Sequence, residues 1–475
     1  MSTEVLPVGV TCNLRCDYCY EQPEREKQAV HKYNREAVLE GIKTATQFWQ
    51  LFGGEPLLIR IEQLEELLQI GYERWGYTGL QTNGTLITPE HIELFIKYKT
   101  QVGISIDGPG ELNDSRWAGT LEATRKATAR SEWAIEEIAR ISRETDNKNI
   151  GPTLIVTLHS GNVSKEVFPQ FEEWLRYLDA IECKFINFHF LEIDHKASKW
   201  DLSDEDLTRV MSRLRKLSSE LKTLEFLNFN ELENLLLGDA NGAMCVWHSC
   251  DAWSTSAVQG LNNEGEPNNC TRGTKDGIAW LPAEGSGKSW KWGIGPDFTT
   301  NRFHERQLAL YVTPEEHGGC KGCRFWLMCT GYCPGTGLQV ADIRGTSEKS
   351  DWRTKSSHCR SLKAQFAEME EKLVAGGQTP ISLRPERAEL EAFTYDQWSQ
   401  GKDCTLGYAL WAYENKNKLE KDPNYTAGLI DRHTDIPHGD HHGDHTDITQ
   451  ISKPVDIPHG DHMDTIPHGD HTDSV

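Results

Sequence analysis

Residues 12–19 read Cys12-Asn13-Leu14-Arg15-Cys16-Asp17-Tyr18-Cys19 and directly follow an apolar stretch, Val5–Val10, that we predict to be the first strand. The three cysteines are spaced as C-x3-C-x2-C. Three thiolates on a tight loop can bind three irons of a 4Fe–4S cube and leave the fourth iron open to a chelating ligand. The alternative is a structural zinc site, although zinc usually takes four ligands at other spacings.

Around this run, short apolar stretches alternate with amphipathic stretches as far as about residue 230. The predicted strands are Val5–Val10, Thr46–Leu51, Thr78–Thr82, Val102–Ile106, Thr153–Leu158 and Phe185–Leu191. The predicted helices are Arg35–Thr44, Ile61–Arg74, Pro89–Tyr98, Leu121–Arg143 and Val167–Leu178. Strand–helix alternation indicates a parallel sheet. The sequence therefore predicts an α/β fold in which residues 1–230 form a partial (β/α)6 barrel of TIM type, with function at the carboxyl ends of the strands.

The bulk composition fits a globular chain of two or three folded units, since 475 residues exceed one ordinary core. The net charge of −22 argues against nucleic acid or an anionic membrane as a partner. No apolar run is long enough to span a membrane, and the first residues do not resemble a signal peptide. Reduced thiols and metal clusters are typical of the cytoplasm. We therefore expect a cytoplasmic protein.

Thirteen cysteines without an export signal indicate metal ligands rather than disulfides. Eight of them lie in residues 231–375, a region rich in Gly, Asn and Trp that we predict to be a small, loop-rich domain stabilised by metal clusters. Cys250 and Cys270 enclose Gly265 in a C-x14-G-x4-C pattern. The remaining cysteines of the region are Cys245, then Cys320, Cys323, Cys329 and Cys333 as C-x2-C-x5-C-x3-C, and finally Cys359. A pair of zinc sites with the same ligands is the alternative.

Residues 5 to about 195 resemble the radical S-adenosylmethionine (SAM) superfamily. The three-cysteine run matches the motif that binds its cluster, and Phe52-Gly53-Gly54-Glu55-Pro56 resembles its GGEP segment. Thr82-Asn83-Gly84 and Ser105-Ile106-Asp107-Gly108-Pro109 resemble its strand-end motifs. The resemblance implies that SAM is held by Tyr18, Gly53, Gly54, Glu55, Pro56, Asn83, Ser105, Asp107 and Arg116.

The family's arginine would fall one position later, where Trp117 stands. Asp107 is also the candidate catalytic residue, and Asp107 and Glu192 are the two candidate general bases.

The later cysteines resemble the SPASM domain of radical SAM enzymes that modify peptides and proteins, such as anaerobic sulfatase maturases. This resemblance implies two auxiliary 4Fe–4S clusters beside the SAM-binding one, and an outside electron donor of the flavodoxin or ferredoxin type. The implied ligands are Cys245, Cys250, Cys270 and Cys333 for one auxiliary cluster, and Cys320, Cys323, Cys329 and Cys359 for the other. A fully ligated cluster favours electron transfer over substrate binding.

Residues 376–430 are predicted to be a partly helical linker (Glu386–Phe393 and Leu406–Lys418), and residues 431–475 a disordered tail. The tail has no aromatic Phe, Trp or Tyr, but nine His, ten Asp and four Pro, so it has little apolar surface to bury. The segment Ile-Pro-His-Gly-Asp-His occurs three times. Eight His-x-Asp triplets begin at His433, His438, His442, His445, His459, His462, His468 and His471.

Three interpretations of the tail stay open: a flexible metal-binding segment, a solvated acidic segment, and a peptide substrate fused in cis. The third is favoured because cyclophane-forming radical SAM/SPASM enzymes join an aromatic ring to the Cβ of the residue two positions later. The resemblance then implies that a 5′-deoxyadenosyl radical takes hydrogen from the Asp Cβ and that a carbon crosslink to the imidazole follows. The candidate modified residues are His438, Asp440, His442, Asp444, His459, Asp461, His468 and Asp470.

About 70 residues separate Cys359 from His433, and flexible chain of that length reaches roughly 40–50 Å. A different enzyme would oxidise or epimerise a residue of a separate protein, and its tail would bind metal.

Overall fold

The structure, a computed structural model, describes residues 3–27, 32–43, 45, 48–145, 151–192, 197–250, 259–268, 304–336, 354–402 and 404–422. By its internal contacts the chain divides into Met1–His441 and His442–Val475, and every described residue belongs to the first unit. The His-x-Asp repeats and Cys270 lie outside the described residues. The predicted domain boundaries at 230, 375 and 430 stay predictions.

The described strands form one sheet in the order β7-β6-β5-β4-β3-β2-β1-β8-β9. Their bounds are β1 Thr3–Val5, β2 Trp49–Leu51, β3 Thr78–Thr82, β4 Thr100–Ser105, β5 Thr153–Leu158, β6 Phe185–Phe190, β7 Glu225–Phe226, β8 Gln259–Leu261 and β9 Pro267–Asn268. Strands β1 to β8 are all parallel, and only β9 pairs antiparallel. From β1 to β7 each strand lies beside the next one in the sequence, which is the arrangement of a partial barrel. The predicted fold class is confirmed.

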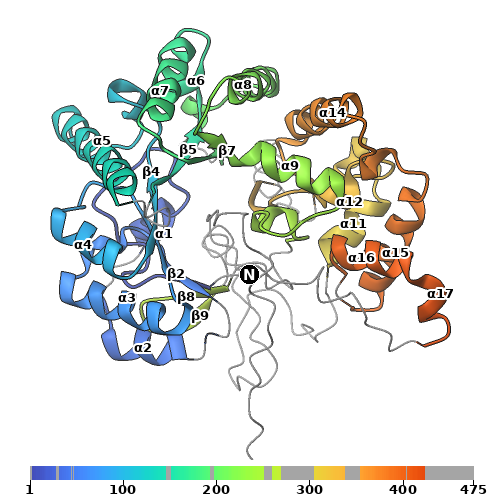
Figure 1. Ribbon diagram of the computed structural model, residues 1–475, viewed down its shortest axis with the longest axis horizontal. Helices are drawn as coiled ribbons and strands as arrows, with labels where there is room; N and C mark the ends of the chain where they lie inside the picture. Colours follow the sequence, from blue (N-terminus) through green and yellow to red (C-terminus); the bar gives the residue numbers. More distant parts are fainter. Residues whose placement is uncertain are drawn as a thin grey trace, which may run out of the picture. The chain divides into compact units, whose positions relative to one another are not determined.

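Helices follow most strands and lie along the outer side of the sheet, as Figure 1 shows for α3, α4, α5 and α7. The helices of the first part are α1 Gln22–Lys27, α2 Arg35–Lys43, α3 Ile61–Trp75, α4 Pro89–Lys97, α5 Leu121–Glu144, α6 Ser160–Val163, α7 Phe168–Ala180, α8 Asp204–Ser218 and α9 Leu227–Leu237. Their apolar faces and the strand side chains share one buried core. Within the described ranges no helix is both long and apolar enough to cross a membrane.

The first strand was predicted in the wrong place. The structure has β1 at Thr3–Val5, whereas residues 6–10 form turns closed by bonds from the Gly9 amide to the Leu6 carbonyl and from the Thr11 amide to the Val8 carbonyl, at 3.0 and 3.1 Å. Leu6 and Val8 are buried in these turns. The apolar run is therefore explained by burial rather than by strand pairing, and the strand ends early so that the cysteine loop can begin.

The hairpin of β8 and β9 joins the sheet beside β1 although it comes from residues after 230. Gly265 forms its turn with φ +68°, and a Cβ at that position would lie 2.0 Å from the carbonyl oxygen of Ala37 in α2. Only glycine fits this backbone conformation and this close approach. The glycine of the C-x14-G-x4-C pattern thus docks the hairpin against the barrel.

The C-terminal part of the described chain is mainly helical. Its helices are α11 Glu305–Val312, α12 Trp326–Cys329, α14 Cys359–Ala375, α15 Arg387–Ser399, α16 Leu406–Glu414 and α17 Lys416–Leu419. Helix α14 packs against α8 and α9, with ion pairs Arg215–Glu368 at 2.6 Å and Lys372–Glu233 at 2.7 Å. The sequence analysis had not predicted α14. The predicted linker helices are present as α15 and α16–α17, and α15 extends beyond its predicted end.

Gly265→Ala should lower the thermal unfolding midpoint of the full chain more than Gly242→Ala does. Both glycines have positive φ, but a Cβ at Gly242 meets nothing within 4 Å, so this control isolates backbone strain of about 1–3 kcal/mol. At Gly265 the clash with Ala37 should add about 1–3 kcal/mol. Calorimetry of the two variants checks this, and equal midpoints would contradict the proposed docking role.

Candidate active site

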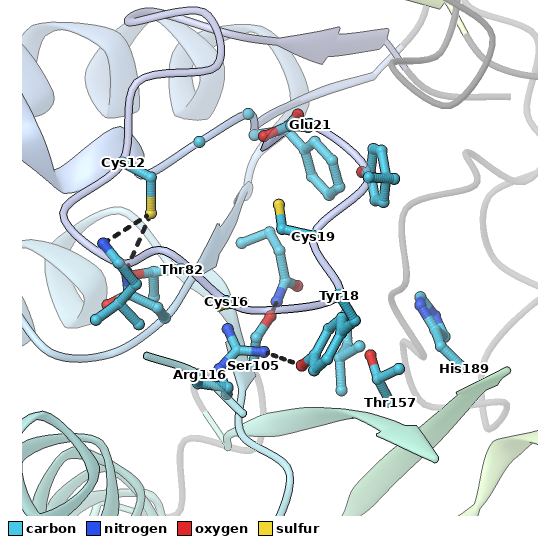
Figure 2. A pocket seen from close by; sticks show the side chains of 18 of the residues that line it. Cys12, Cys16, Tyr18, Cys19, Glu21, Thr82, Ser105, Arg116, Thr157 and His189 are labelled. Atoms are coloured by element: carbon cyan, nitrogen blue, oxygen red, sulfur yellow. Dashed lines mark hydrogen bonds between the residues drawn. The ribbon is translucent and has the colours of Figure 1, made fainter. Parts of the chain in front are cut away.

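One cavity at the carboxyl ends of the strands gathers most of the predicted site residues (Figure 2). It is lined by Cys12, Cys16, Tyr18, Cys19, Gly53, Gly54, Asn83, Ser105, Arg116 and Glu192 from the prediction, and also by Leu14, Tyr20, Glu21, Arg25, Phe52, Gln81, Thr82, Ile155, Thr157, His189 and Phe190. Glu55, Pro56 and Asp107 are buried outside its lining. The sequence therefore predicted many residues of the cavity wall, but three residues that it assigned to SAM binding, Glu55, Pro56 and Asp107, lie behind that wall.

The cysteine loop is held against the Gly53-Gly54 loop by backbone hydrogen bonds. The Gly54 amide donates to the Gly9 carbonyl and the Glu55 amide donates to the Thr11 carbonyl, both at 2.9 Å. A Cβ on residue 54 would lie 2.1 Å from the Thr11 oxygen. Glycine at this position is thus required by the contact between two loops of the chain itself.

The other end of the cysteine loop is fixed by the segment after β4 and by one cation. The amides of Arg15 and Asp17 donate to the Trp117 and Ser115 carbonyls at 2.7 and 2.8 Å. Arg25 donates from Nη1 to the Leu14 carbonyl at 2.8 Å and from Nη2 to the Cys19 Sγ at 2.7 Å. Cys12 Sγ accepts from the Leu14 amide at 3.4 Å and from Asn83 Nδ2 at 3.8 Å. N–H groups directed at sulfur are typical surroundings of a thiolate-bound cluster.

The three thiols lie where a thiolate is costly without a nearby cation. Burial raises the pKa of Cys12 and of Cys19 to about 12, and burial also raises the pKa of Cys16. The negative charge of Cys16 adds to the rise at both of the other thiols. Bound iron would supply the positive charge that ionised thiols need here. The donor set therefore fits an iron–sulfur cluster.

Across the described ranges, no three His, Cys, Asp or Glu side chains converge as ligands of a single metal ion. In a 4Fe–4S cube each thiolate binds a different iron, so the three sulfurs need not meet at one point.

Glu55 is fully buried and its carboxylate is occupied by the chain. It accepts from the Leu57 amide at 3.0 Å, the Thr82 hydroxyl at 2.7 Å and the Asn83 amide at 2.8 Å. It caps the short helix η1, Pro56–Leu58, and thereby fixes Pro56. Burial raises the pKa of Glu55, and these hydrogen bonds oppose the rise. In the structure Glu55 positions Asn83 at the cavity wall rather than facing the cavity.

Asp107 lies in a buried network beneath Tyr18. Its carboxylate accepts from the Tyr18 hydroxyl, from the Thr157 amide at 3.0 Å and from the Ser115 hydroxyl at 3.3 Å. Arg116 lies 3.9 Å from the carboxylate and donates to the Tyr18 hydroxyl at 3.0 Å, the contact drawn in Figure 2.

The ring of His159 lies 3.6 Å from the same carboxylate. Burial favours a raised pKa for Asp107, but the hydrogen bond from His159 and the charge of Arg116 outweigh burial, so the pKa is lowered. Asp107 is thus an ionised anchor for two cavity residues.

Four C-terminal cysteines lie near enough for their charges to interact, namely Cys320, Cys323, Cys329 and Cys359. Burial raises the pKa of Cys320 to about 12, and the charges of Cys359 and Cys323 contribute to the rise. Burial and then the charges of Cys320, Cys359 and Cys323 raise the pKa of Cys329. These are the four ligands that the resemblance assigned to one auxiliary cluster.

For the other auxiliary cluster, Cys245, Cys250 and Cys333 are described. The buried Arg306 links the segments that carry Cys333 and Cys250. Its Nη1 donates to the Tyr332 carbonyl at 2.7 Å and lies 3.5 Å from the Cys250 carbonyl. Gln307 donates to the same Cys250 carbonyl at 2.9 Å. Arg306 could not be predicted from the sequence, because an arginine in a helix is usually exposed.

The sequence analysis also missed Arg25, Gln81, Thr157 and His189. Thr157 and His189 occupy positions just before the ends of β5 and β6, so their place in the strand alternation was a usable signal. Arg25 comes from α1, a six-residue helix too short for a periodic pattern.

A family model matches the part of the chain that contributes most of the residues lining this cavity. Residues 6–165 match the model of the Radical SAM superfamily. A cysteine-type anaerobic sulfatase-maturating enzyme of Clostridium perfringens (strain 13) is 24% identical over 402 residues, which are 77% of this chain and 95% of that one. A serine-type enzyme of the same name from Bacteroides thetaiotaomicron is 38% identical over 128 residues, 23% of this chain and 30% of that one.

A solved structure of similar fold is that of anSMEcpe with bound AdoMet and Cp18Cys peptide. Its TM-score is 0.56 at 21% identity, and the match covers 79% of this chain and 99% of that one. This likeness extends through both the barrel and the C-terminal helical part.

Asp107→Asn should reduce the free energy of unfolding by about 3–5 kcal/mol, because it leaves Arg116 as a buried charge without its counterion. The control is Asp114→Asn, whose exposed pair with Arg125 at 2.6 Å should contribute at most about 1 kcal/mol. Urea unfolding measures both.

The lowered pKa of Asp107 also predicts how the stability of the protein depends on pH. The ionised Asp107 contributes its full share of the free energy of unfolding above its unfolded pKa of about 3.9. The difference in free energy of unfolding between wild type and Asp107→Asn should therefore shrink as the pH falls below that value. If Asp107→Asn and Asp114→Asn lost the same free energy of unfolding, the anchoring role of Asp107 would be contradicted.

Proposed function

We propose that this chain is a radical SAM enzyme that modifies a peptide, namely the His-x-Asp repeats of its own residues 431–475. The proposed product is a carbon crosslink between the imidazole and the Asp Cβ of a triplet. The observation that carries this proposal is the repeated spacing itself, an imidazole always two residues before a carboxylate-bearing Cβ in eight triplets.

The cofactors of the proposal fit the two groups of thiols described above. Cys12, Cys16 and Cys19 would hold the SAM-binding 4Fe–4S cluster, and the C-terminal cysteines would hold two auxiliary clusters. When bound, the first cluster and SAM supply the ability to remove a hydrogen atom from an unactivated carbon. A flavodoxin- or ferredoxin-type protein would supply the electron.

The chain's own residues would bind and orient these groups. Arg25 offers positive charge at Cys19, and the Tyr18–Arg116 pair is fixed from below by Asp107. Gln81 donates from Nε2 to the Ser105 hydroxyl at 2.8 Å, which fixes both side chains at the wall where SAM would lie. A preorganised wall of this kind reduces the cost of binding a flexible sulfonium ligand.

A peptide substrate is supported by the relatives. The solved structure of anSMEcpe that shares this fold contains a bound peptide, and the curated relatives are named as enzymes that mature sulfatases. These relatives also support the second candidate function, a maturase that acts on a separate protein while the tail binds metal. The repeated His-x-Asp spacing favours the first candidate, because metal binding requires His and Asp but no fixed interval between them.

The flexible chain between Cys359 and the tail is shorter than predicted, because part of it is helical. The estimated reach of about 40–50 Å treated all residues from Cys359 to His433 as flexible, but α14 to α17 fold much of that length. The described part of the chain ends at Asp422. Fully extended, the 16 residue steps from there to His438 span at most about 58 Å. A tethered substrate still has a high effective concentration within that radius.

Anaerobic expression with cluster-assembly proteins should yield a tail that is lighter by about 2 Da per modified triplet, because each crosslink removes two hydrogens. Tandem mass spectrometry of residues 431–475 locates them. The control is Cys16→Ala, which should form no 5′-deoxyadenosine and leave the tail mass unchanged. An unmodified tail in a wild-type chain that does produce 5′-deoxyadenosine would favour a separate substrate.

A further inference from the structure

The proposed crosslink requires an acceptor for a proton. One hydrogen leaves the Asp Cβ as an atom and is taken up by the 5′-deoxyadenosyl carbon. The Cβ then bonds to the imidazole ring, and the ring must lose one electron and one proton to regain aromaticity. The C-terminal cysteines would hold an auxiliary cluster that would accept the electron, so that the two hydrogens and the electrons balance. The proton needs a base of the chain that faces the cavity.

Four buried carboxylates lie in or behind this cavity: Glu21, Glu55, Asp107 and Glu192. Glu55 and Asp107 are outside the lining, and each accepts three hydrogen bonds from the chain. The choice is therefore between the two carboxylates that line the cavity.

Glu21 belongs to the cysteine side of the cavity. It follows Cys19 by two positions, and in Figure 2 it lies beside the cysteine loop. Burial, and to a smaller extent the charge of Glu21, raise the pKa of Cys19. A carboxylate at that place faces the region where the cluster would be bound, so its effect falls on the thiols.

Glu192 lies at the opposite end of the strand order. It comes two residues after β6, and β6 is separated from β1 by four strands in the sheet. Its neighbours in the lining include His189, Phe190 and Thr157, and its residue is 7% exposed. Figure 2 shows His189 and Thr157 on the side of the cavity away from Cys12. A substrate side chain that enters beside β5 and β6 would meet this wall.

The segment that carries Glu192 is fixed by residues adjacent to predicted auxiliary-cluster ligands. The imidazole of His358, next to Cys359, lies with Nε2 3.1 Å from the Leu191 carbonyl. The ring of Phe190 packs against His358 with centroids 5.2 Å apart, and against Tyr332, next to Cys333, at 6.0 Å. The segment therefore contacts both regions where the electron would be received.

We propose that Glu192 is the catalytic base that accepts this proton, and that His358 is a positioning residue for the segment Phe190–Glu192. The inference rests on the proposed function. It places the proton acceptor on the same segment that the auxiliary-cluster regions contact. Proton and electron would then leave the substrate on one side of the cavity, opposite the side where SAM would bind.

The experiment compares Glu192→Gln with the surface control Glu122→Gln, whose side chain is 86% exposed, in the full chain with reconstituted clusters. Glu192→Gln should keep iron content and SAM affinity within about twofold of wild type and still form 5′-deoxyadenosine. Its yield of tails lighter by 2 Da should fall by a factor of roughly 10²–10⁴, the usual contribution of a general base. Glu122→Gln should keep at least about half of the wild-type crosslinking rate once corrected for iron content. Glu192→Asp should recover part of the activity.

The outcomes separate this inference from the proposed function. Wild-type crosslinking that persists in Glu192→Gln would overturn the role of Glu192 and leave the function standing. A Glu192→Gln chain that also loses iron or SAM affinity would show a structural role and overturn the inference. A wild-type tail that never loses 2 Da, although 5′-deoxyadenosine is formed, would overturn both.

Discussion

The close backbone contact between the loop after β2 and the cysteine loop is the constraint on which the site depends. The Gly54 and Glu55 amides reach the Gly9 and Thr11 carbonyls, and no side chain larger than hydrogen fits at position 54. Because parallel strands end at one edge, this contact brings the three thiols within reach of the ends of β3 and β4. The buried Asp107 then holds the other half of the wall through Tyr18 and Arg116.

Charge is balanced differently on the two sides of the cavity. On the β1 side, burial raises the pKa of the Cys12 and Cys19 thiols, and the charge of Arg25, which donates to the Cys19 Sγ, opposes that rise. On the β6 side, Glu192 is placed by contacts from the C-terminal helical part. The C-terminal part thus does more than contribute cysteines, because it also contacts the β6 side of the barrel.

Much of the fold could be predicted because strand and helix periods are local signals. The bounds of β3 and β5 agree with the prediction, whereas β1 was misplaced because Val5–Val10 is apolar through burial in turns. The strand β8 was missed because a three-residue strand carries no periodic pattern. Within the site, motif spacing located the cavity, but it could not show that Glu55 and Asp107 point into the wall. Side-chain direction there depends on hydrogen bonds to Thr82, Thr157 and Ser115, which lie far away in sequence.

The most direct test of the central claim is electron paramagnetic resonance of the anaerobically reconstituted, reduced chain, in which the eight C-terminal cysteines are replaced by alanine to leave one cluster site. The account predicts a 4Fe–4S signal that changes on addition of SAM, with coupling between the cluster and a ¹⁷O- or ¹⁵N-labelled methionyl group. A signal that SAM leaves unchanged, or zinc in place of iron at Cys12, Cys16 and Cys19, would contradict it.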